Sequence, residues 1–175
     1  MDIETCSYRR SEGYFLMVSE MVPYKRLDYA ISLFRRTGRR LKIVGGGPDY
    51  ARLRNLASDT IEFCGRVTDS ELSDIYAACE AFIVPGEEDF GISMVEALAS
   101  GKPVIAEPTE AALCIALHKF DQVRGAMSTS LMQSRASRFS EVAFQTRFRK
   151  ALSRMWKDLK PPPARGERSL QRIHS

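Results

Sequence analysis

Histidine and cysteine are scarce in this chain of 175 residues, and their scarcity limits the chemistry it can carry. The two histidines are His118 and His174, so general-base catalysis of the Ser-His-Asp or Cys-His kind has little to work with. The four cysteines show no C-x-x-C spacing, which argues against a structural zinc site. We therefore expect neither a hydrolase of these kinds nor a bound metal.

Long hydrophobic runs are also missing. No apolar stretch reaches the roughly 18 to 20 residues that span a bilayer, and residues 1–4 lack the apolar core of a signal peptide. Cys64 and Cys79 lie within apolar runs, where we expect small buried side chains in a reducing compartment. These features predict a cytoplasmic protein with at most peripheral membrane contact.

The positive charges are spread along the chain. There are 26 Lys and Arg against 22 Asp and Glu, a net charge of +4, and no single basic block. Arg35, Arg36, Arg39 and Arg40 flank a glycine at the end of an expected helix, where cations favour the helix dipole and cover exposed carbonyls. Because this explains the cluster, we expect no nucleic acid partner.

Short apolar runs alternate with helix-length segments over the first part of the chain. The runs are apolar at nearly every position and closed by glycine or proline, as strands buried on both faces of a parallel sheet require. Regular alternation implies right-handed crossovers, so the predicted fold class is α/β with a Rossmann-like, doubly wound parallel sheet. The expected strands are residues 15–19, 41–45, 61–65, 81–85 and 104–106, and the expected helices are residues 26–37, 49–57, 69–78 and 92–100.

Helical patterns alone continue beyond about residue 113. Residues 128–159 are expected to form two C-terminal helices joined near residues 138–140. The second helix carries a stripe at i, i+4 spacing, which is more often core than cofactor contact; its members are Phe144, Phe148, Leu152 and Trp156. Residues 160–175 cannot bury enough apolar surface to order themselves, so we expect them to be disordered.

The loop after residues 81–85 has the strongest chemical signal, because ligands of parallel α/β sheets lie outside the carboxyl ends of the strands. Glu88 and Glu96 are separated by seven residues, with Phe90 and Gly91 opening a helix between them. A glycine lets the backbone approach a ligand, and the N–H groups of a helix start attract phosphate or sugar oxygens. Alternatively, Glu88 is an ordinary acid at a helix start and Glu96 a solvated helix residue.

Two further loops follow strands. Lys25 and Arg26 would present a point charge and a planar fork to a pyrophosphate, although two solvated cations at a helix start explain them equally well. Residues 45–48, Gly-Gly-Gly-Pro, do not fit G-x-G-x-x-G. A tight strand-to-helix turn before an N-terminal proline is therefore the preferred interpretation of that segment.

Several of these segments together resemble glycosyltransferase family 4 in order and spacing. The matching blocks are residues 18–19, 22–26, 43–48, 63–67 and 88–106. The similarity covers residues 13–106 closely and resumes in the closing helices. It implies one half of the two-domain B-type glycosyltransferase fold, with residues 13–159 as a Rossmann-like donor-binding domain.

The resemblance also implies roles for the motif residues. Lys25 matches the cation that steadies the donor diphosphate, with Arg26 beside it. Glu88 matches the first glutamate of the family's E-x7-E motif, near the transferred sugar, and Glu96 matches the second, which holds the ribose hydroxyls. Lys25 and Glu88 are thus the candidate catalytic residues, and all four are candidate donor-binding residues.

Main-chain contacts complete the implied donor site. The main chain of Phe90, Gly91 and Ile92 would contact sugar and phosphate, and the backbone near Val67 would meet the base. The implied reaction transfers a hexose from a GDP- or UDP-linked sugar with retention of anomeric configuration, and residues 22–26 resemble the mannosyltransferase variant. The resemblance implies no cofactor, because cationic side chains and a helix end neutralise the leaving diphosphate.

Three departures from the family pattern stand out. Glu20 occupies the position of a family arginine five residues before Lys25, where a carboxylate would repel the diphosphate. After Ala106, a segment with a glycine-rich loop, a helix and a strand is expected to be missing. The chain also begins at an expected linker remnant, residues 1–12, so we expect either a truncated product or one half of a split enzyme whose acceptor domain is a separate chain.

Two alternatives to an active donor domain remain open. Glu20 and the missing acceptor domain favour a catalytically inactive nucleotide-sugar binding or scaffolding module. The other alternative is a flavodoxin-like regulatory or nucleotide-binding domain that shares only the fold, since a fold alone does not set function.

Overall fold

The structure is a computed structural model that describes residues 8–88 and 90–159. The chain divides into two compact units between Ser140 and Glu141. The first unit holds the sheet and the helices up to α6, and the second holds α7 (Glu141–Leu159). The expected linker 1–12 is described from Tyr8 onwards, and the expected disordered segment 160–175 lies outside the described residues.

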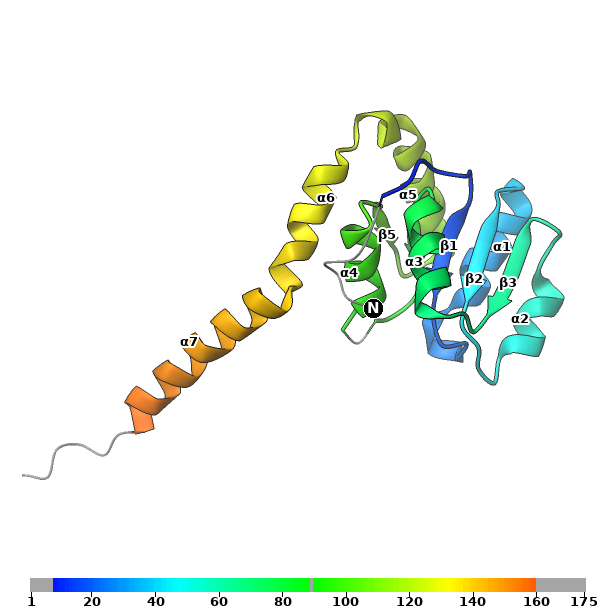
Figure 1. Ribbon diagram of the computed structural model, residues 1–175. Helices are drawn as coiled ribbons and strands as arrows, with labels where there is room; N and C mark the ends of the chain where they lie inside the picture. The colour runs from blue at the N-terminus through cyan, green and yellow to red at the C-terminus, as the bar shows by residue number, and fades with distance from the viewer. Residues whose placement is uncertain (1–7, 89, 160–175) are drawn as a thin grey trace, which may run out of the picture. The chain divides into compact units, whose positions relative to one another are not determined.

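Five parallel strands form one sheet in the order β3-β2-β1-β4-β5 (Figure 1). This confirms the predicted α/β class with a doubly wound parallel sheet. The strand order reverses between β1 and β4, which is the topological switch point where such sheets bind ligands. The strands are β1 (Phe15–Val18), β2 (Leu41–Val44), β3 (Ile61–Gly65), β4 (Phe82–Val84) and β5 (Val104–Ala106).

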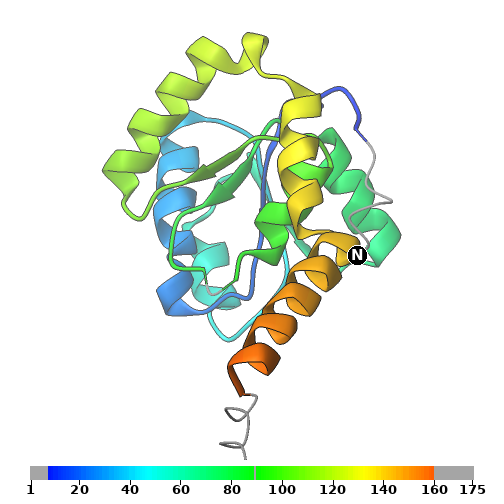
Figure 2. The same cartoon turned by 90° about the vertical axis from the view of Figure 1, so that its left-hand side faces the viewer.

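Helices cover both faces of the sheet, with α1 and α5 on one side and α3 and α4 on the other (Figure 2). Their bounds agree with the expected ones to within one or two residues where a range was predicted. The elements are α1 (Leu27–Thr37), α2 (Tyr50–Leu56), α3 (Asp69–Ala78), α4 (Ile92–Ala99), α5 (Glu110–Val123) and α6 (Thr129–Ala136), with short 3-10 helices η2 (Pro23–Lys25), η3 (Arg124–Ala126) and η4 (Ser137–Phe139).

The core consists of two apolar layers, one on each face of the sheet. Successive side chains of a strand point to opposite faces, so Phe15 joins the layer beneath α1 and α5 whereas Leu16 joins the layer beneath α3 and α4. The Phe15 ring lies edge-on to Phe34, with centroids 5.1 Å apart, and to Phe120, at 5.8 Å. Burial on both faces explains why the strand sequences are apolar almost throughout.

Local signals define several helix ends. Thr68 and Glu71 form a complete capping box at the start of α3, and Gly38 closes α1 in the left-handed conformation. The arginines around Gly38 have protein partners: Arg36 pairs with Glu110 at 2.6 Å, and Arg39 pairs with Asp121. Both pairs attach α1 or the residues after it to α5, so these cations stabilise the fold.

The connection from β5 to α5 is short. Only residues 107–109 separate the two elements, and Thr109 caps α5 by accepting a hydrogen bond from the Ala112 N–H at 3.2 Å. Doubly wound sheets of the Rossmann type have six strands in the order 3-2-1-4-5-6. Among the described residues this sheet stops at β5, in the place where the sequence predicts that a loop and an edge strand are missing.

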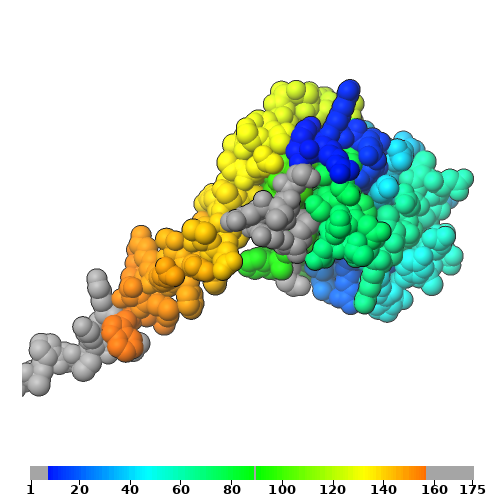
Figure 3. Space-filling view, viewed as in Figure 1, coloured from blue at the N-terminus to red at the C-terminus, as the bar shows by residue number. Residues whose placement is uncertain are grey.

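The first described residues run along the surface of the first unit. The Arg9 N–H donates to the Ala77 carbonyl at 3.0 Å, and the Glu12 N–H donates to the Ala78 carbonyl at 2.9 Å. Figure 3 shows this segment in dark blue above the green α3. Cys79, at the end of α3, is buried as expected, but Cys64 is only partly buried because β3 lies at an edge of the sheet.

The second unit corrects one prediction. The stripe on α7 was expected to be core, but its side chains are exposed: Phe144 by 62%, Phe148 by 51%, Leu152 by 48% and Trp156 by 70%. The rings of Phe144 and Phe148 stack on each other, with centroids 5.7 Å apart. Helical spacing identifies a face that is suited to burial, but it does not identify the surface that buries it.

Among the described residues, none of the helices is both long and apolar enough to cross a bilayer.

Candidate functional site

The candidate site lies at the carboxyl ends of β1 and β4, the two strands that flank the switch point. β1 leads through residues 19–22 into η2, which ends at Lys25, and β4 leads through Pro85 and Gly86 toward α4. A Cβ at Gly86 would overlap the Lys25 carbonyl. Glycine is therefore needed at position 86 for the two loops to touch, and their contact brings together segments about 60 positions apart in the sequence.

Lys25 and Glu88 form an ion pair within this contact. The Lys25 Nζ lies 3.1 Å from the Glu88 Oε1, and Lys25 is 9% exposed. The Glu88 side chain remains 25% exposed. A partly buried ammonium beside a carboxylate at the mouth of a parallel sheet can exchange that carboxylate for a phosphate group, since both are anionic oxygen ligands.

The helix α4 begins beside this pair. Gly91 is its N-cap residue with φ of 77°, and a Cβ there would lie 2.6 Å from the Met94 Cε. The flanking Phe90 and Ile92 are 75% and 62% exposed, as residues at the rim of a binding site can be. The first N–H groups of a helix have no intrahelical acceptor, so this end of α4 offers donors to an anion or a sugar oxygen.

Glu96 is buried in the second turn of α4, at 8% exposure, which excludes its interpretation as a solvated helix residue. Its Oε2 accepts a hydrogen bond from the Tyr76 hydroxyl of α3 at 3.0 Å. Burial raises the pKa of Glu96 above the usual range of a glutamate, and the Tyr76 hydrogen bond opposes that rise. A carboxylate held in this way is oriented by its neighbour and suits recognition of hydroxyl groups.

Arg26 is already engaged by its own helix. Among the described residues it is the one non-glycine with positive φ, at 52°. Its Nε and Nη2 donate to the two oxygens of Asp28 at 3.2 and 3.3 Å, and its guanidinium lies 3.5 Å from the centre of the Tyr29 ring. The hydrogen bond that Arg26 donates to the Asp28 carboxylate raises the pKa of Arg26. A diphosphate would have to draw this side chain away from both neighbours.

The glycine-rich loop after β2 fits the interpretation as a tight turn. A Cβ on Gly45 would overlap the Ser19 carbonyl, and a Cβ on Gly47 would lie 2.6 Å from the Met21 carbonyl. The Met21 N–H donates to the Gly46 carbonyl at 2.9 Å. These glycines thus let the loops after β1 and β2 pack backbone to backbone, which supports the position of η2 and Lys25.

The other two positions singled out from the sequence lie near the edges of this arrangement. Val67 is partly buried, packs against the core layer beneath α3 and α4, and precedes the cap residue Thr68. Glu20 is exposed in the loop between β1 and η2, and its carbonyl accepts hydrogen bonds from the Ser19 hydroxyl and the Val22 N–H. Tyr76 is the site residue that sequence reasoning missed, since nothing in its spacing marks it as the partner of Glu96.

Comparison with known proteins gives a match to one protein family. A family model described as glycosyl transferases group 1 matches residues 8–125. A GDP-mannose-dependent alpha-mannosyltransferase of Mycobacterium tuberculosis is 41% identical over 90 residues, which are 51% of this chain and 24% of that protein. A GDP-mannose-dependent alpha-(1-6)-phosphatidylinositol monomannoside mannosyltransferase of the same species is 37% identical over 107 residues, covering 51% of this chain and 28% of that protein.

Solved structures share the fold. Anabaena HepE in complex with UDP superimposes with a TM-score of 0.69 at 20% identity, covering 81% of this chain and 49% of that one. The lipopolysaccharide outer core galactosyltransferase WaaB superimposes with a TM-score of 0.71 at 18% identity, covering 89% and 54%. The chain therefore spans about half the length of these solved structures and about a quarter of the curated mannosyltransferases. The family match also excludes the alternative in which only the fold is shared.

Proposed function

Because this chain belongs to the glycosyl transferases group 1 family, whose model matches residues 8–125, we propose that it is the donor-binding domain of a retaining glycosyltransferase. In this proposal a nucleoside diphosphate sugar binds outside the carboxyl ends of β1 and β4. The observation that carries the proposal is the ion pair of Lys25 with Glu88, 3.1 Å apart at the switch point of the sheet.

Each site residue has a role in the proposed complex. The diphosphate takes the place of the Glu88 carboxylate beside Lys25, and Glu88 turns toward the hydroxyls of the transferred sugar. Glu96, oriented by Tyr76 at 3.0 Å, holds the ribose hydroxyls. Arg26 remains a donor-site candidate that must first leave Asp28.

The backbone supplies the remaining contacts. The main chain of residues 90–92 contacts sugar and phosphate at the start of α4, and the backbone near Val67 meets the base. In the transfer step the bond between the anomeric carbon and the diphosphate oxygen breaks, and a bond to the acceptor oxygen forms with the same anomeric configuration. The acceptor hydroxyl loses its proton to the leaving diphosphate. Negative charge develops on the leaving diphosphate, which Lys25 and the start of α4 stabilise without a metal or other cofactor.

GDP-mannose is the proposed donor. Two relatives at 41% and 37% identity are described as GDP-mannose-dependent, whereas the solved HepE structure, at 20% identity, contains UDP. Isothermal titration of the chain with GDP-mannose and UDP-glucose distinguishes the two. We expect GDP-mannose to bind at least about tenfold more tightly, a difference of about 1.4 kcal/mol. Equal affinities, or tighter binding of UDP-glucose, would refute this choice of donor.

An acceptor-binding domain on a separate chain is the proposed partner. The chain aligns with about half of the HepE and WaaB structures, and α7 presents an exposed apolar face that includes Phe148 and Leu152. Adding the acceptor half of the M. tuberculosis alpha-mannosyltransferase to this chain should produce transfer from GDP-mannose. Phe148→Glu should abolish that transfer while leaving donor binding intact; unchanged transfer would show that this face does not bind the acceptor half.

A catalytically inactive binding or scaffolding module is the second candidate, favoured by Glu20 in the loop before Lys25 and by the short connection from β5 to α5. The test is Glu20→Arg in the same two-part mixture. Activity that appears only with the arginine supports an inactive natural protein, and activity in the unaltered chain refutes it. A cytoplasmic location is proposed as well, supported by the buried free thiol of Cys79.

A further inference from the structure

A cavity lies at the opposite end of the strands from the candidate donor site. Its volume is about 510 Å³, within the range of pockets that hold small molecules. Cys79 and Glu80, which precede β4, line it together with Lys102 and Pro103, which precede β5. Because the strands are parallel, this cavity opens at their amino ends, whereas Lys25 lies at their carboxyl ends.

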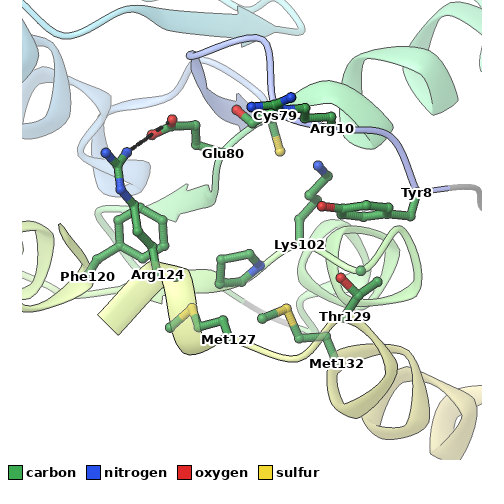
Figure 4. A pocket seen from close by; sticks show the side chains of 14 residues that line it. Tyr8, Arg10, Cys79, Glu80, Lys102, Phe120, Arg124, Met127, Thr129 and Met132 are labelled. Carbon is green, nitrogen blue, oxygen red and sulfur yellow. Dashed lines mark hydrogen bonds and ion pairs between the residues drawn. The ribbon is translucent and has the colours of Figure 1, made fainter. Parts of the chain in front are cut away.

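Lys102 supplies a buried cation to this cavity. The residue is 3% exposed, its Nζ donates to the Arg9 carbonyl at 2.7 Å, and it lies 4.4 Å from the centre of the Tyr8 ring. Figure 4 shows the side chain extending between Tyr8 and Cys79. Lys102 takes part in none of the ion pairs found among the described residues.

Within residues 8–88 and 90–159, the buried ammonium of Lys102 has one carbonyl acceptor and is incompletely satisfied. An ammonium has three N–H donors, and a buried charge without a counter-ion costs free energy. Burial lowers the pKa of Lys102, while the nearby Cys79 and Glu80 oppose that shift. An anionic ligand would supply the counter-charge and accept the remaining hydrogen bonds.

The other residues that line the cavity include both charged and apolar side chains. Arg124 pairs with both Glu80 oxygens at 3.2 Å, and Arg10 contributes a further cation. With these three cations and one carboxylate, the lining has a net charge of +2. Apolar side chains complete the lining, namely Phe120, Met127 and Met132 (Figure 4).

We propose that this cavity is a second ligand site, which binds a phosphate monoester carried on an aromatic or branched apolar body. The dianionic phosphate matches the lining charge of +2, with Lys102 as its buried counter-ion. The apolar body lies against the methionines and Phe120. The site is separate from the proposed donor site, so its occupancy does not require a nucleotide.

Phenyl phosphate is the probe that tests this site, with the full chain labelled at its methionine methyl groups. Met127 and Met132 line the cavity, and Met94 lies beside Gly91 at the donor site. We expect the NMR signals of Met127 and Met132 to shift saturably below about 1 mM ligand, a typical affinity for so small a molecule. Shifts confined to Met94, or no shift at several times that concentration, would overturn the proposal.

Two comparisons define the recognition chemistry. Lys102→Met should weaken phenyl phosphate at least about tenfold by removing the counter-ion, whereas Lys119→Met, at an exposed lysine of α5, should leave the affinity unchanged. Inorganic phosphate should bind at least about tenfold more weakly than phenyl phosphate, because it lacks the apolar body. Equal affinity of the Lys102 variant, or of inorganic phosphate, contradicts the proposed site. The methionine signals of the unaltered chain decide the question even where the Lys102 variant does not fold.

Discussion

Replacing Glu88 by glutamine is expected to strengthen the binding of a nucleoside diphosphate, because the carboxylate competes with the diphosphate for Lys25. The Lys25 Nζ lies 3.1 Å from the Glu88 Oε1, and Lys25 is 9% exposed. A diphosphate that reaches Lys25 must first displace this carboxylate. Glutamine keeps the length of the side chain and a hydrogen-bond acceptor but removes the negative charge.

The size of the effect follows from the burial of the pair. Hydrogen bonds to charged groups contribute about 1.5–3 kcal/mol. The Glu88 side chain is 25% exposed, so solvent screens part of the attraction, and glutamine retains part of the hydrogen bond. We therefore expect an effect just below this range, about 1.4 kcal/mol, which corresponds to roughly tenfold tighter binding of GDP.

Isothermal titration with GDP measures this change without involving the transferred sugar, which Glu88 is proposed to contact. The matched control is Glu87→Gln, at the adjacent exposed carboxylate, which changes the net charge of the chain equally. We expect that control to alter the affinity by less than about twofold, as for an exposed charge. Affinity for GDP that is unchanged or weaker in Glu88→Gln, or equally improved in both variants, would refute the competition.

Three further predictions concern stability. Burial raises the folded-state pKa of Glu96, so its stabilising contribution is complete at low pH and is lost as pH rises through that raised pKa. Glu96→Gln should therefore resist urea better than the unaltered chain at pH 7 but not at pH 4. Gly45→Ala should cost at least about 3 kcal/mol in urea unfolding, because its Cβ would overlap the Ser19 carbonyl at a φ of 123°, whereas Gly46→Ala should cost less than about 1 kcal/mol. Arg39 lowers the pKa of Asp121, so this ion pair stabilises the folded chain above the ordinary aspartate pKa, and that stabilisation is lost as pH falls. Asp121→Asn should therefore lower the free energy of unfolding by about 1 kcal/mol at pH 7 and leave it unchanged near pH 2. An equal cost at both pH values would contradict the pairing.

The sheet and its helices could be predicted because their signals are local. A strand such as β1 is buried on both faces, so its sequence is apolar throughout. Its neighbour β2 is followed by Gly45, where the backbone closely approaches Ser19. The nearness of Lys25 to Glu88 follows from topology, since both lie after strands that flank the switch point. Their ion pair could not be predicted from topology. It depends on the side-chain rotamers and on the close approach of the two loops that glycine at position 86 allows.

Side-chain contacts between different helices could not be predicted from the spacing of residues along the sequence. The bond between Tyr76 and Glu96 joins α3 to α4, and neither residue carries a signal for the other. The stripe on α7, including Phe148 and Trp156, was interpreted as core but is exposed, because periodicity describes one surface and burial requires two. The cavity around Lys102 could not be predicted either, because its lining residues come from separate parts of the chain and form no sequence motif.

The measurement that tests the donor site most directly is isothermal titration of the unaltered chain, Lys25→Met and Lys119→Met with GDP and UDP. We predict saturable binding of at least one nucleotide below about 1 mM, a loss of at least about tenfold in Lys25→Met, and no change in the Lys119 control. Binding that survives the loss of Lys25, or no binding of either nucleotide at several millimolar, would contradict the assignment of Lys25 and the carboxyl ends of β1 and β4 as a nucleotide-sugar site.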